Sequence, residues 1–211
     1  MVTDRPDSAS ELDIFVEEHR AVRDPLSSQF YELYRDAFDP LASKAAARHL
    51  LDEHEWRKEM LDERILKLLA NQGGRVVGLA TVALDIRAVP WVSTAFYERQ
   101  YPGRQIYYTG VAAVEPAHQS SAVFERLLRH GLMRAMEDDA VCAFDCSYFV
   151  ESAGFPDMIN RVTSEVSGGR FTPVDTQTYY VFDTSGEEVI DLRTPERERG
   201  SAPDGDRSGP P

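Results

Sequence analysis

The segment that decides the fold runs from Val111 to Leu128: Val-Ala-Ala-Val-Glu-Pro-Ala-His-Gln-Ser-Ser-Ala-Val-Phe-Glu-Arg-Leu-Leu. An apolar, strand-like run ends at Val114, a turn containing Pro116 follows, and small residues open an amphipathic helix expected over about Ser121 to Met136. A helix that starts in this way presents free backbone N–H groups and the positive end of its dipole. The segment therefore predicts a site for an anion such as a pyrophosphate.

Strand-like and helix-like segments alternate on both sides of this segment. Strands are expected over 12–17, 65–70, 75–85, 106–114 and 141–150, with one or two more in 171–182. The sequence Asn71-Gln-Gly-Gly between the second and third of these strands predicts a hairpin turn. Further helices are expected after Asp24-Pro25, after Asp52 and over 156–166. The order β-α-α-β-β-β-α-β-α-β predicts a mixed α/β fold of the α+β class.

Two of these helices carry explicit start signals. Asp24-Pro25 has the form of an N-cap followed by proline at the first helical position. Asp52 and Glu55 have the spacing of a capping box ahead of Trp56. Asp39-Pro40 is expected to end or kink the first helix.

Composition and charge restrict the class of protein. The chain has 211 residues, enough for one ordinary domain, and no run of it approaches the roughly 18 apolar residues that span a bilayer. The formal net charge of −13 argues against nucleic acid and anionic membranes as partners, because both attract clustered Lys and Arg. The polar N-terminus has no apolar signal core, and Cys142 and Cys146 lie too close in one run to favour a disulfide. We therefore expect a cytoplasmic protein.

The two ends of the chain differ from its middle. Residues 1–10 and 184–211 are polar, and the second stretch is also rich in Pro and Gly, so both are predicted to be disordered. Residues 11–183 are predicted to form the folded domain.

The segment quoted above resembles the pyrophosphate loop of the GNAT (N-acetyltransferase) superfamily. Members carry Val-x-Pro, then Arg or Gln, two residues, Gly, one residue, and Gly or Ala. Here Val114-Glu-Pro116 matches the first part and Gln119 the Arg-or-Gln position, while Ala122 and Phe124 stand where the small residues are expected. The element order extends the resemblance over most of residues 12–183.

The resemblance implies a central, mostly antiparallel sheet flanked by helices and splayed between its fourth and fifth strands. Acetyl-CoA or another acyl-CoA would lie in the gap, with backbone groups near Ala112 and Val114 paired to its pantetheine arm and thioester carbonyl. The residues implied for the pyrophosphate are Gln119, Ser120, Ser121, Ala122, Val123 and Phe124.

The implied activity is that of an acyl-CoA-dependent N-acyltransferase, most simply an N-acetyltransferase, acting on an amine of a small molecule or protein. A catalytically inactive GNAT-like module that binds a ligand or protein is the alternative, suggested by the lost loop glycines and by the absence of tyrosine from the helix expected over 156–166. No metal is implied, and His and Cys do not occur together at metal-ligand spacing. A homodimer is left open.

Four residues are candidates for the acceptor side of such a site. Tyr108 stands where some relatives carry a glutamate base, which makes it the candidate catalytic residue, although a sheet aromatic is the simpler explanation. Asp145 is a charged residue within an apolar run. Its carboxylate either faces the substrate or is hydrogen-bonded in a purely structural role. Trp91 and Tyr97 belong to the long segment 87–105, which either walls an acceptor pocket or forms a short helix on the sheet.

Overall fold

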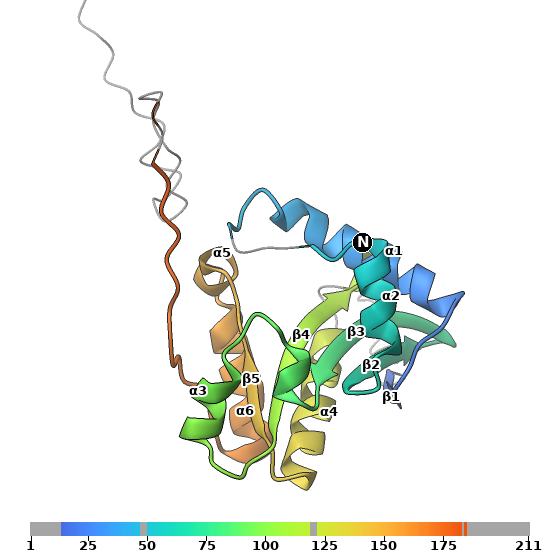
Figure 1. Ribbon diagram of the computed structural model, residues 1–211. Helices are drawn as coiled ribbons and strands as arrows, with labels where there is room; N and C mark the ends of the chain where they lie inside the picture. Colours follow the sequence, from blue (N-terminus) through green and yellow to red (C-terminus); the bar gives the residue numbers. More distant parts are fainter. Residues whose placement is uncertain (1–13, 47–49, 119–121, 183, 185–211) are drawn as a thin grey trace, which may run out of the picture.

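The structure is a computed structural model that describes residues 14–46, 50–118, 122–182 and 184. Its elements follow in the order β1 (Phe15–His19), α1 (Leu26–Phe38), η2 (Asp39–Leu41), α2 (Glu53–Leu61), β2 (Ile65–Gln72), β3 (Arg75–Ala83), η3 (Ile86–Ala88), α3 (Thr94–Gln100), β4 (Ile106–Val114), η4 (Pro116–His118), α4 (Val123–Glu137), β5 (Val141–Phe144), α5 (Tyr148–Ser152) and α6 (Phe155–Ser167) (Figure 1). The ends predicted as disordered, 1–10 and 184–211, lie outside the described residues except for Thr184.

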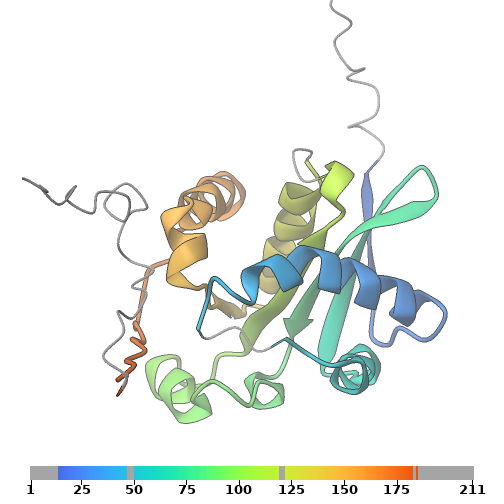
Figure 2. The same ribbon diagram turned by 90° about the horizontal axis from the view of Figure 1, so that it is seen from above.

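The five strands form one sheet in the order β1-β2-β3-β4-β5. Neighbours are antiparallel from β1 to β4, whereas β4 and β5 are parallel because α4 returns the chain between them. The helices α4 and α6 lie on one side of the sheet, and α1, α2 and α3 lie on the other (Figure 2). The predicted α+β class with a mostly antiparallel sheet is confirmed.

The predicted hairpin is formed by β2 and β3. Its turn consists of Gly73 and Gly74, with φ of 59° and 80°, a left-handed backbone that glycine adopts without strain. The predicted capping box is also present, because the Asp52 carboxylate accepts from the Glu55 N–H and the Glu55 carboxylate accepts from the Asp52 N–H.

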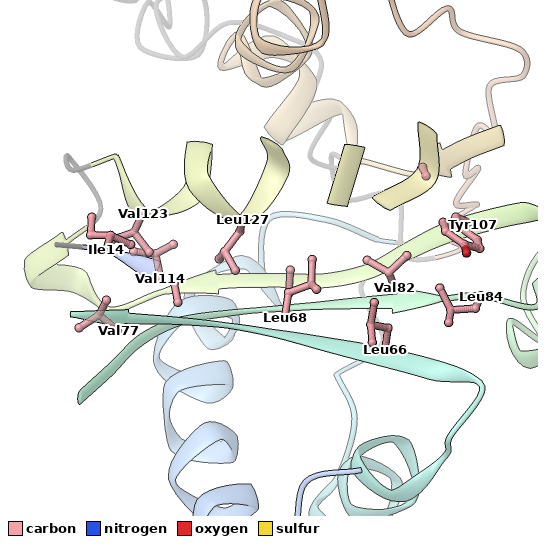
Figure 3. Close-up of a cluster of buried hydrophobic side chains, with 13 residues drawn as sticks. Ile14, Leu66, Leu68, Val77, Val82, Leu84, Tyr107, Val114, Val123 and Leu127 are labelled. Carbon is pink, nitrogen blue, oxygen red and sulfur yellow. The ribbon is translucent and has the colours of Figure 1, made fainter. Parts of the chain in front are cut away.

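The core under α4 is built from every second residue of the sheet. Leu66 and Leu68 of β2 and Val82 of β3 face Val123 and Leu127 of α4 (Figure 3). The start of α4 approaches the sheet closely at Gly78, where an added Cβ would lie 2.7 Å from Val123 Cγ1. This contact fixes the first turn of α4 over β3.

The opposite face of the sheet carries two separate apolar clusters. One lies under α1 and α2 and is centred on Trp56, whose Nε1–H donates to the Ser27 carbonyl at 3.0 Å. The other lies under the segment 86–101 and includes Ala83, Ile106 and Tyr108. The residues between these two clusters are polar, and they belong to the candidate site.

Three predictions about local structure were wrong. The strand expected over 141–150 ends at Phe144, because Ser147 caps α5 and its hydroxyl accepts from the Val150 N–H. Pro25 occupies the N-cap position of α1 rather than its first turn, and Asp24 accepts from the Ser28 hydroxyl.

The final strands expected over 171–182 are the third error. Phe171 packs against Phe144, with ring centroids 5.0 Å apart, but the segment then leaves α6 and runs away from the sheet (Figure 1). Its side chains are solvated, and Tyr180 is 90% exposed. An alternating apolar pattern becomes a strand only beside a partner, and the four-residue β5 offers a short edge.

Candidate active site

The parallel strands β4 and β5 pair along the whole of β5 but along only the first part of β4. Hydrogen-bonded pairing of β4 with β5 runs from Ile106 opposite Val141 to Thr109 opposite Phe144. The strand β4 continues to Val114, whereas β5 has ended and the chain turns into α5. In the described part of the chain, no strand pairs with this edge of β4 beyond Thr109.

The register of β4 with β3 decides which of its main-chain groups point toward the gap. The Glu115 N–H donates to the Val77 carbonyl at 3.0 Å, so Glu115 belongs to a pair that is hydrogen-bonded across to β3. In an antiparallel ladder such pairs alternate with pairs whose N–H and C=O groups point outward. With Ala112 opposite Ala80 and Val114 opposite Gly78, the N–H and C=O groups of both residues point away from β3, toward the gap.

A β-bulge interrupts β4 where the gap begins. Gly110 and Val111 together oppose the single residue Thr81, because the register shifts between Ala80 and Val82. The Thr81 hydroxyl replaces a ladder carbonyl and accepts from the Val111 N–H at 3.0 Å. Gly110 is exposed, so the backbone of β4 is open to solvent at this point.

The first turn of α4 lies at the end of the same edge. Val123 is fully buried and shares a core cluster with Val114, which places the helix start beside the end of β4. The N-cap residue Ala122 makes no side-chain hydrogen bond to the first turn, and the helix dipole presents its positive end to an anion there. The Phe124 ring packs on Phe155 of α6 at a centroid distance of 5.6 Å. The predicted ligands Gln119, Ser120 and Ser121 lie outside the described residues.

The four residues predicted for the acceptor side are brought together. The Tyr108 hydroxyl donates to Asp145 Oδ1 at 2.6 Å. The rings of Trp91 and Tyr97 each lie edge-on to the Tyr108 ring with centroids 6.4 Å apart. Of the two alternatives for the segment 87–105, the short helix is observed, because Tyr97 belongs to α3 and packs on a core cluster. Trp91 is 58% exposed, and the acceptor pocket stays a prediction.

The surroundings of Tyr108 keep its phenol protonated. Burial is the largest effect and the hydrogen bond to Asp145 the next, and both raise the pKa of Tyr108 above its ordinary value. A general base at neutral pH requires a pKa shifted in the opposite direction. Tyr108 therefore acts as a hydrogen-bond donor that orients the Asp145 carboxylate.

A row of polar residues crosses the sheet between the two apolar clusters. Lys67 of β2 lies opposite Thr81 of β3, and Thr81 lies opposite the bulge at Gly110. The Lys67 ammonium is buried and donates to the carbonyls of Arg20 at 3.1 Å and Asp62 at 2.8 Å. Burial lowers the pKa of Lys67 to about 8.

Glu59 of α2 completes this row. Its carboxylate hydrogen-bonds with Thr81, and Oε1 lies 3.9 Å from the position of a Cβ added at Gly110. Burial raises the pKa of Glu59, while the Thr81 hydroxyl and the Lys67 charge oppose that rise. Neither Glu59 nor Lys67 was predicted from the sequence as a site residue. Two features of the sequence could have indicated them. Glu59 is a carboxylate between Trp56 and Met60 on an apolar helix face, and Lys67 interrupts the apolar run of β2.

Neither metal clusters nor membrane spans are found in the described residues. The described His, Cys, Asp and Glu side chains include no group of three placed to hold a metal ion. No described helix combines the length and the apolar character that crossing a bilayer requires.

Comparisons with known proteins rest on structure alone, since no protein-family model and no curated protein matches the sequence. An aminoglycoside acetyltransferase from an uncultured soil metagenomic sample, in complex with sisomicin, superposes with a TM-score of 0.52 at 16% identity, covering 82% of this chain and 98% of that one. A possible acetyltransferase from Clostridium difficile 630 gives 0.53 at 13% identity, covering 81% and 99%. AAC(6')-Iy with a bisubstrate analog of CoA gives 0.50 at 11% identity, covering 81% and 98%.

These solved structures share the arrangement described above along nearly their whole length. Identities of 11–16% establish a common fold and nothing finer. The fold implied by the sequence resemblance is thus confirmed: the chain has the fold of the GNAT acetyltransferases.

Proposed function

We propose that this protein transfers an acyl group from an acyl-CoA thioester, most simply acetyl-CoA, to an amine in the gap between β4 and β5. The observation that carries the proposal is the unpaired edge of β4, where Ala112 and Val114 direct their main-chain groups into the gap beside the start of α4. A pantetheine arm contains two amides, and it would bind this edge as an added strand does. The pyrophosphate would then lie at the N-terminus of α4.

The same edge suits the chemistry of acyl transfer. Negative charge develops on the thioester oxygen as the amine attacks, and a main-chain N–H of β4 aimed at that oxygen would stabilise it. Positioning the two reactants side by side would supply much of the remaining rate enhancement. The reaction in this form uses acyl-CoA as a co-substrate and needs no metal.

The acceptor would lie against the aromatic residues Trp91, Tyr97 and Tyr108, with Asp145 at their side. An exposed carboxylate next to aromatic rings favours a positively charged amine, through both charge attraction and cation–π contact. The net charge of −13 also attracts cationic acceptors over longer distances.

Calorimetric titration with CoA and acetyl-CoA tests the proposal. A ligand at 100 times its dissociation constant adds about 2.7 kcal/mol to the free energy of unfolding, so thermal unfolding gives a second readout. Ala122→Asp should abolish CoA binding, because it places a carboxylate among the phosphates. Asp is a favoured N-cap residue, so this change does not remove the helix.

The matched control is Ala95→Asp, which makes the same substitution at an exposed position of α3 and should leave CoA affinity unchanged. Equal CoA affinity in Ala122→Asp and wild type would place the phosphates elsewhere. A wild-type protein that binds neither CoA nor acetyl-CoA would contradict acyl transfer, and would leave a binding module with this fold.

A further inference from the structure

Glu59 lies beside the bulge of β4, at the start of the unpaired edge. Its Oε1 reaches the bulge of β4 at Gly110, which is exposed and stands at the first unpaired position after Thr109. A thioester carbonyl bound along the edge of β4 would lie beside this bulge. The carboxylate approaches from the face of the sheet that also carries Tyr108 and the aromatic acceptor wall.

The carboxylate is held in one orientation. The Thr81 hydroxyl already accepts the Val111 N–H at 3.0 Å, so its own hydrogen is free to be donated to Glu59. The buried Lys67 ammonium faces Glu59 from β2, and the Asp62 carboxylate faces it from the turn after α2. Among the described residues, Lys67 of β2 and Asp62 of this turn are the charged groups that act on Glu59.

The other candidate carboxylate is already engaged. Asp145 accepts the Tyr108 hydroxyl at 2.6 Å and is exposed, whereas Glu59 is largely enclosed by α2 and the sheet. Enclosure weakens the solvation of the ionised carboxyl and so raises the pKa of Glu59, in the direction that suits a general base near neutral pH.

We propose that Glu59 accepts the proton of the acceptor amine during acyl transfer, directly or through one water molecule. The nitrogen lone pair forms the C–N bond at the thioester carbon, the C–S bond breaks, and CoA leaves as the thiolate. Glu59 takes the proton that the bound ammonium loses before attack, the second proton on nitrogen passes to solvent after the C–N bond has formed, and the thiolate takes a proton from solvent. The inference rests on the acyl transfer proposed above.

The test compares Glu59→Gln with Glu63→Gln, a neighbouring exposed carboxylate changed in the same way. The assay follows acetyl transfer from acetyl-CoA to two cationic probes, spermidine and sisomicin, across pH. Glu59→Gln should lower kcat/KM by about 10²–10⁴-fold and abolish the loss of rate at acid pH, with CoA affinity unchanged in calorimetry. Glu63→Gln should behave as wild type. Equal turnover in the two variants would overturn the assignment.

Thr81 provides a second readout that a purely structural role would not move. Removing its hydroxyl in Thr81→Val raises the pKa of Glu59, so the acid limb of the rate profile should move to higher pH, and Thr81→Ser should restore it. An acid limb that stays in place in Thr81→Val would overturn the assignment. Failure of the proposed function looks different: the wild type itself would bind no CoA, or would acetylate neither probe.

Discussion

Gly78 sets how closely α4 approaches the sheet, and replacing it tests that contact. In Gly78→Ala the new Cβ would lie 2.7 Å from Val123 Cγ1 and 3.3 Å from Leu127 Cδ1. Val123 is fully buried and β-branched, so it has little freedom to turn aside. The start of α4 must therefore shift away from β3.

The expected cost follows from two opposing contributions. Overpacking a core costs about 1–3 kcal/mol, while replacing glycine reduces the freedom of the unfolded chain and returns about 0.4–1 kcal/mol. We expect Gly78→Ala to lower the free energy of unfolding by about 1–2 kcal/mol, which corresponds to a few degrees in Tm for a domain of this size. Affinity for CoA should fall as well, because the helix start moves relative to the edge of β4.

Gly131→Ala is the matched control on the other side of the same interface. Its Cβ would lie 3.5 Å from Leu68 Cδ1, an ordinary contact, and alanine is favoured over glycine inside a helix by about 0.5–1 kcal/mol. The two Gly-to-Ala variants should therefore change stability in opposite directions in chemical denaturation followed by circular dichroism. A Gly78→Ala protein as stable as wild type would refute the close approach of α4.

Three further outcomes are expected. Trp91→Ala should raise the KM for the acceptor while CoA affinity stays constant. Because Trp91 is 58% exposed, the loss in free energy of unfolding should be well under the roughly 3–5 kcal/mol of a core tryptophan. An unchanged KM would exclude Trp91 from the acceptor pocket. Tyr108→Phe should lower the free energy of unfolding by about 1–2 kcal/mol through loss of the hydrogen bond to Asp145, whereas Asp145→Asn, which keeps an acceptor, should cost less in the same denaturation assay. Burial lowers the pKa of Lys67 from 10.5 to about 8, so between these pH values the unfolded chain binds one proton more than the folded protein. The free energy of unfolding should therefore increase as the pH rises through this range. Lys67→Met should remove this increase, and an identical pH dependence of stability in both proteins would contradict the reasoning.

The parts of the fold that the sequence predicted are those specified by local chemistry. Two glycines with left-handed backbone define the turn of the β2–β3 hairpin, and the reciprocal bonds of Asp52 and Glu55 define the start of α2. Each signal is contained within a few residues, so no knowledge of distant partners was needed.

The errors arose where structure depends on distant partners. The run 171–182 alternates like a strand, but pairing requires a neighbouring edge, and the edge of β5 is four residues long. The length of β5 was in turn set by the cap at Ser147, which resembles any other serine in an apolar run. An alternating apolar pattern indicates that a segment is able to form a strand, whereas a neighbouring strand to pair with decides whether the strand forms.

The residues proposed for the acceptor were singled out in the sequence, whereas the residue proposed to accept the proton was not. Trp91, Tyr97, Tyr108 and Asp145 stood out as aromatic or acidic residues in unusual settings, and the structure places them together. Glu59 carries no motif, and its significance appears only when the register places Thr81 and the bulge beneath it.

The polar row across the sheet has a consequence for how the domain tolerates change. Because Lys67 and Thr81 separate the apolar cluster under α1 and α2 from the cluster under 86–101, each cluster packs against the sheet on its own. We expect the amide hydrogens of the segment 86–101 to exchange without unfolding of the rest of the domain. Substitutions in this segment should lower mainly the stability of the smaller cluster. The segment can thus vary in sequence while the cluster around Trp56 and the packing of α4 on the sheet stay constant.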